Sequence, residues 1–169
     1  EGTHYQLNNA TCYPKPLQKP GPPIVIGGVG ERRTLPAVAQ YADEWNGSGV
    51  DAQTYNVKKS LLVSKCEDIG RDPATLTYQV LTGILVGHTP SELATRLRNV
   101  KSVLQNQKSI TDAKTPQDLI QYGWVVGTPT QVIEQLHEYV EAGAQRIIVE
   151  TYDNDDFDEL HVIGNEILP

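Results

Sequence analysis

The sequence alternates short strand-like runs with helical segments, and the alternation repeats four times along the chain. Three of these runs are rich in Val, Ile, Leu, Thr or Tyr, one is a very short run that ends at Trp45 and Asn46, and each is followed by a segment whose apolar residues have helical spacing. The runs cover residues 24–26, 41–46, 75–86 and 145–151. Repeated strand–helix units call for parallel strands joined by right-handed crossovers. The sequence therefore predicts an α/β fold, and four such units amount to half of a TIM (β/α)8 barrel.

A half barrel leaves two sheet edges and one apolar face uncovered. We expect the second half to come either from a missing N-terminal segment or from a second copy of the chain, as a homodimer. The whole sequence is predicted to be one domain, residues 1–169. Residues 1–23 form a hairpin and a proline-rich strap, residues 24–152 the strand–helix units, and residues 153–169 a tail with a closing helix. An opening hairpin and strap suggest that this is the C-terminal part of a longer polypeptide.

The first unit contains a glycine-rich turn between its strand and its helix. Residues 24–26 are β-branched, Gly27, Gly28 and Gly30 follow, and a helical pattern begins at Thr34. Free backbone N–H groups and the positive end of the helix dipole meet at such a turn, which favours a phosphate group. The pattern departs from G-x-G-x-x-G because Arg33 occupies the third glycine position. A tight turn that binds no ligand is the alternative interpretation.

Composition limits the classes of partner. The formal net charge of −7 over 169 residues argues against a nucleic-acid partner, which needs a basic surface. The apolar runs are too short to cross a bilayer, and no secretory signal opens the sequence, so we expect a cytoplasmic protein without a membrane partner. Cys12 and Cys66 are typical of isolated thiols rather than of a disulfide. No spacing of His, Cys, Asp or Glu is typical of a metal site, and none is expected.

His88 and two tryptophans are further candidates. His88 follows the longest strand-like run, where barrel enzymes keep their chemistry, but it also precedes the capping box of residues 89–92. It is therefore either a general acid or base, a polar contact to substrate, or a residue that helps to cap the next helix. Trp45 and Trp124 could stack on a ring, although large aromatic residues near strand ends more often belong to the core.

Six stretches, taken together, resemble the bacterial luciferase-like monooxygenase family. They are GTHYQL at 2–7, PKPLQKP at 14–20, PPIVIGGVGE at 22–31, YADEWN at 41–46, GTP at 127–129 and GAQRIIV at 143–149. The resemblance runs essentially from end to end, and the order of the stretches is more specific than any one of them. Members of that family are TIM barrels that use reduced flavin mononucleotide (FMN) or the deazaflavin coenzyme F420. The chain resembles barrel strands five to eight, and the resemblance does not distinguish the two cofactors.

The resemblance also implies site residues. In the family, the loop after the fifth strand touches the flavin ring edge and phosphate, which here falls on Ile26, Gly27, Gly28, Val29, Gly30 and Glu31. Arg32 and Arg33 lie close enough in sequence to add charge-assisted hydrogen bonds. Trp45 and Asn46, at the end of the next strand, and His88 are expected to line the substrate pocket. The family's catalytic histidines lie mostly on the first four strands, so no catalytic residue is assigned here. Residues 87–126 correspond to a lid-like insertion found in many members.

These inferences lead to two functional hypotheses. The first is the C-terminal portion of a flavin- or F420-dependent oxidoreductase or monooxygenase that contributes part of the cofactor site. The second is a non-catalytic half barrel that associates with itself, with or without bound flavin.

Overall fold

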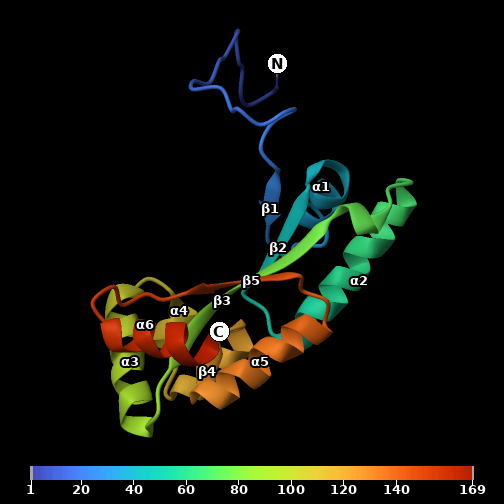
Figure 1. Ribbon diagram of the computed structural model, residues 1–169. Helices are drawn as coiled ribbons and strands as arrows, with labels where there is room; N and C mark the ends of the chain where they lie inside the picture. Colours follow the sequence, from blue (N-terminus) through green and yellow to red (C-terminus); the bar gives the residue numbers. More distant parts are fainter. Residues whose placement is uncertain (1, 169) are drawn as a thin grey trace.

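The computed structural model describes residues 2–168 and contains a parallel β-sheet (Figure 1). Its strands are β1 (Val25–Gly27), β2 (Glu44–Ser48), β3 (Thr77–Val86), β4 (Val125–Gly127) and β5 (Arg146–Glu150). Their order is β1-β2-β3-β5, and β4 pairs with the last residues of β3. Every pairing is parallel, which confirms the α/β interpretation and fits a partial barrel.

Helices connect consecutive strands. The α-helices are α1 (Thr34–Tyr41), α2 (Ala52–Asp68), α3 (Pro90–Val103), α4 (Lys108–Thr111), α5 (Pro129–Glu141) and α6 (Phe157–Val162). Shorter turns are η1 (Pro73–Thr75), η2 (Pro116–Tyr122) and the π-helical η3 (Ile163–Ile167). The predicted start of α3 is confirmed: the Thr89 hydroxyl accepts the Glu92 N–H at 3.2 Å, and proline occupies the first turn. Thr128 and Gln131 form a second capping box at α5.

The main core lies between the sheet and helices α1, α2 and α5. Side chains alternate across a strand, and Trp45 and Val80 point to the helical side, where both are fully buried. The Trp45 ring stacks on Tyr55 of α2 with centroids 5.0 Å apart, and Tyr139 of α5 meets Tyr55 edge-on at 6.0 Å. These aromatic contacts join one face of the sheet to two of its helices.

The opposite face of the sheet is open. Its middle carries a polar group in which Glu44 accepts hydrogen bonds from Gln79 and, at 2.7 Å, from Arg146 Nη1. Val25 and Ile148 lie on the same face by alternation and are 51% and 37% exposed. In a closed barrel this face would be the interior.

Residues 87–126 form a second, smaller core against the end of β3. Leu85, Leu97, Ile110, Leu119 and Trp124 are all buried within it. Polar residues dominate positions 106–114 and predict an exposed, mobile connection, but Ile110 and Ala113 anchor this stretch, at 1% and 4% exposure. The insertion is therefore a packed unit.

Several local expectations were wrong. The hairpin predicted in residues 3–13 does not form: the described residues before β1 contain no helix or strand, and Figure 1 shows them extending away from the sheet. Helical spacing predicts that Val57, Leu61, Leu62 and Ile69 form the inward stripe of α2. The buried residues are instead Ala52, Tyr55, Leu62 and Cys66, and Val57 and Ile69 are 54% and 56% exposed. Helical spacing also predicts that Val132, Ile133, Leu136 and Val140 all point inward on α5, but Val140 is 52% exposed. Strand β4 was not predicted. Between residues 2 and 168, none of the helices combines the length and apolar composition needed to span a membrane.

Candidate functional site

The glycine-rich turn after β1 is fixed to the neighbouring strand β2 by two hydrogen bonds. Gly28 donates its N–H to the Asn46 carbonyl at 2.9 Å, and its own carbonyl accepts the Trp45 indole N–H at 2.9 Å. Gly28 has φ of +110°, a conformation that other residues rarely adopt. The backbone beyond Gly28 therefore leaves the sheet in a defined direction, and a side chain at position 28 would strain it.

An open pocket of about 980 Å³ lies between this turn and helix α2, and we call it the loop pocket. It is lined by Val29, Gly30, Glu31, Arg32, Arg33 and Lys58. Three cationic side chains face one carboxylate, in a protein whose formal net charge is −7. The Lys58 ammonium lies 2.5 Å from Glu31, and that hydrogen bond, followed by the lysine charge, lowers the pKa of Glu31. The two arginines make no ion pair within the described residues.

Backbone donors also point to an anion at this turn. The N–H groups from Val29 to Thr34 make no hydrogen bond to any protein acceptor in the described chain. The first turn of α1 itself offers few free N–H donors, because the Leu35 N–H donates to the Gly30 carbonyl at 2.9 Å and Pro36 has no N–H. The loop amides and the arginines, rather than the helix end alone, fit a phosphate group.

The other residues expected at the cofactor and substrate sites lie in different places. Ile26 packs against the core, and Gly27 pairs with Asn46. Trp45 is fully buried, and it contacts the loop through the hydrogen bond from its indole N–H to the Gly28 carbonyl. The Asn46 side-chain oxygen is buried and has no hydrogen-bond partner among the described residues. His88 is exposed, and its Nε2 lies 3.2 Å from Glu166 in the C-terminal segment. Neither Trp45 nor His88 lines the pockets described in this section.

A second pocket lies beside the last residues of β2 and β5 and the middle of β3, and we call it the aromatic pocket. Its volume is about 280 Å³, and its walls include Leu81, Ile110, Tyr122, Trp124, Glu150 and Tyr152. Sequence reasoning missed it because its members come from distant segments. The available signal was that Glu150 ends β5, Tyr152 follows shortly after it, and Trp124 directly precedes β4.

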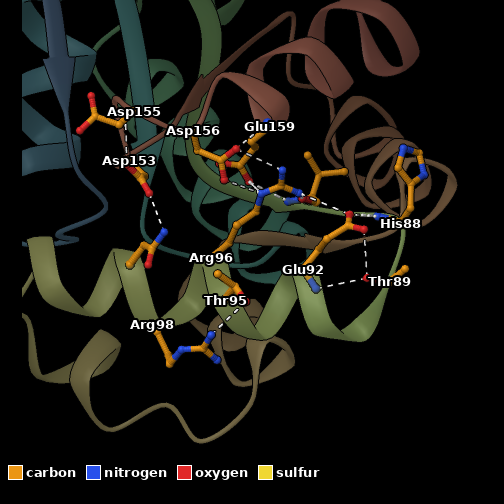
Figure 2. Close-up of polar contacts among 12 residues, drawn as sticks. His88, Thr89, Glu92, Thr95, Arg96, Arg98, Asp153, Asp155, Asp156 and Glu159 are labelled. Carbon is orange, nitrogen blue, oxygen red and sulfur yellow. Dashed lines mark hydrogen bonds and ion pairs between the residues drawn. The ribbon is translucent and has the colours of Figure 1, made fainter.

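Behind β3, a buried ionic cluster joins α3 to the C-terminal segment (Figure 2). Arg96 binds both oxygens of Asp156, at 2.7 Å and 3.2 Å, and also donates to the Val86 carbonyl. Glu159 accepts the Val86 N–H at 3.0 Å and is only 3% exposed. Burial raises the pKa of Glu159 to about 7, although Arg96 opposes the shift. The cluster ties the tail to the end of the longest strand, and Asp156 also caps α6.

No group of three or more His, Cys, Asp or Glu side chains within residues 2–168 is arranged to hold a metal ion. The chemistry that this arrangement supports is anion binding at the loop pocket and small-molecule binding at the aromatic pocket.

Known proteins with the same architecture identify the family. Residues 1–146 match the luciferase-like monooxygenase family. The chain is 26% identical, over an alignment of 190 residues, to an FMNH2-dependent dimethylsulfone monooxygenase of Pseudomonas putida, covering 99% of the chain and 51% of that protein.

Solved structures agree on the fold. An F420-dependent secondary alcohol dehydrogenase, in complex with an F420–acetone adduct, has a TM-score of 0.76 at 14% identity over 99% of this chain and 54% of that chain. The F420-dependent tetrahydromethanopterin reductase of Methanopyrus kandleri has a TM-score of 0.65 at 14% identity, over 87% and 50%. The chain thus spans about half the length of the proteins it matches. It belongs to the luciferase-like monooxygenase family.

Proposed function

We propose that this chain is the C-terminal portion of an FMN- or F420-dependent oxidoreductase or monooxygenase, and that the loop pocket binds the cofactor phosphate. The observation that carries the proposal is the excess of positive charge beside free backbone N–H groups in that pocket. The names of the relatives support it, because they describe FMNH2-dependent and F420-dependent enzymes. Both cofactors fit the same chemistry, and the loop does not favour either.

Each part of the loop has a separate task. Gly28 and Gly30 allow close approach of the backbone, and the amides from Val29 to Thr34 donate to phosphate oxygens. Arg32 and Arg33 add charge-assisted bonds. Trp45 holds the Gly28 carbonyl, so the loop is shaped before the cofactor binds. The bound cofactor would supply the redox chemistry, and the protein would orient it and exclude water.

Replacing both arginines by serine (R32S/R33S) is expected to weaken FMN binding by about tenfold to a hundredfold. Two hydrogen bonds to a charged phosphate would be lost, and each is worth roughly 1.5–3 kcal/mol before screening by solvent. Quenching of flavin fluorescence during titration measures the dissociation constant. Arg98, an exposed arginine on α3, provides the control (R98S), which should bind FMN like the wild type. Equal affinity of R32S/R33S and the wild type would remove the loop pocket from the cofactor site.

The second candidate, a non-catalytic half barrel that forms a homodimer with or without flavin, is favoured by one observation. The sheet face that bears Val25, Ile148 and the Glu44–Arg146 pair is not covered by any helix of residues 2–168. A complementary N-terminal half or a second copy would cover it. Light scattering of the purified chain separates these partners: a dimer supports self-association, and a folded monomer argues against it.

A further inference from the structure

We infer that the aromatic pocket binds the organic substrate, and that this substrate is a small aromatic molecule whose amine or hydroxyl group donates a hydrogen bond to Glu150. The inference rests on the proposed function, because it assigns the substrate to the same rim of the sheet as the cofactor. The residues expected from sequence to line the substrate pocket, Trp45, Asn46 and His88, do not line this one.

The position of the pocket fits a substrate site. Ser48 at the end of β2, Leu81 and Gly83 in β3 and Glu150 at the end of β5 all line it, and the packed insertion closes it from outside through Ile110. Carboxyl ends of parallel strands are where barrel enzymes place their chemistry. A volume of about 280 Å³ is near the lower end of ligand pockets, so the ligand is small.

One wall is a rigid pair of aromatic rings. Trp124 stacks on Tyr152 with ring centroids 5.2 Å apart and an angle of 25° between the ring planes. The indole lies directly on Gly83, where an added Cβ would come within 2.5 Å of the ring. Gly83 therefore provides the space that Trp124 occupies. Rings that are already fixed lose little conformational entropy when a ligand stacks on them.

The charge of the pocket selects the polar end of the ligand. Glu150 is the one charged side chain that lines it within the described chain, and no lysine, arginine or histidine does. The Tyr152 hydroxyl donates to Glu150 Oε2 at 2.6 Å and fixes the carboxylate, while no hydrogen bond of the described residues uses Oε1. A carboxylate in this position accepts from N–H or O–H donors and repels acids.

The two pockets have opposite charge and share one edge of the sheet. The loop pocket follows β1, whereas the aromatic pocket lies against β3 and the end of β5, and β2 separates β1 from β3. Charge therefore directs a phosphate to the loop pocket and an uncharged or cationic aromatic group to the aromatic pocket.

Isothermal titration calorimetry with tyramine and 4-hydroxyphenylacetate tests this inference, because the two share a ring and differ in charge. The wild type should bind tyramine at least tenfold more tightly than the acid. The E150Q variant should lose that preference, and W124L should weaken tyramine binding at least tenfold. W124F, which keeps a ring, should bind nearly like the wild type and guards against misfolding of W124L. E134Q, which alters an exposed acid on α5, is the matched control.

The inference is overturned if the wild type binds neither probe, if the acid binds as tightly as the amine, or if E150Q keeps the preference. Parallel titration with FMN separates this result from the proposed function. FMN binding without tyramine binding contradicts only the aromatic pocket, whereas tyramine binding without FMN binding contradicts only the cofactor site.

Discussion

Replacing Arg96 by methionine (R96M) is expected to lower the free energy of unfolding by about 3–5 kcal/mol, the usual cost of removing one partner of a buried ion pair. Arg96 is 6% exposed and holds Asp156, Glu159 and the Val86 carbonyl in one place (Figure 2). Methionine fills a similar volume but leaves the buried Glu159 and the partly buried Asp156 without their cation. Urea denaturation followed by circular dichroism measures the change.

Arg98 provides the control for that experiment, since it lies on the same helix and its side chain is exposed, with hydrogen bonds only to Ala94 and Thr95. The R98M variant should change the unfolding free energy by less than about 0.5 kcal/mol. Equal losses of unfolding free energy in R96M and R98M would show that the ionic cluster does not anchor the C-terminal segment.

The free energy of unfolding is expected to fall as pH rises from about 5 to 8, and Glu159 is the cause. Its pKa is about 7 in the folded protein and near 4.5 when unfolded, so the folded state holds the proton more tightly. Its stabilising contribution is therefore complete below pH 4.5 and is lost as pH rises through 7. A shift of this size corresponds to about 3 kcal/mol.

The E159Q variant should remove most of this pH dependence, because glutamine still accepts the Val86 N–H but does not titrate. Asp156 contributes with the opposite sign: its hydrogen bond to Arg96 lowers its pKa, so its contribution is lost only in acid, outside this window. Denaturation of both proteins at pH 5, 6, 7 and 8 separates the two groups. A wild-type slope that persists in E159Q would assign the effect to another residue.

The sequence predicted the parts of the fold that depend on local pattern. Runs of β-branched residues, the proline after Thr89 and the glycine after α5 mark element ends through steric and hydrogen-bonding rules that act over a few residues. Strand β4 escaped prediction because Val125–Gly127 is only three residues long and pairs with the extension of β3. The hairpin predicted in residues 3–13 does not form because its short strand-like runs have no sheet to pack against.

The candidate site also has a part that could be predicted from local sequence and a part that depends on tertiary structure. The turn from Gly27 to Arg33 is contiguous, so its residues could be recognised together. Lys58 joins the loop pocket from another helix, and Glu150 joins Trp124 only through the pairing of β5 with β3. The buried position of Trp45 depended on which face of β2 meets α2, which the short strand does not specify.

Amide chemical shifts during titration with FMN, compared with riboflavin, test the central claim most directly. Riboflavin has the same ring system but no phosphate. The account predicts that FMN shifts the amide resonances of Gly30, Glu31, Arg32 and Arg33, and that riboflavin leaves them largely unchanged. FMN shifts that avoid this loop, or riboflavin shifts of equal size within it, would contradict the assignment of the loop pocket to the cofactor phosphate.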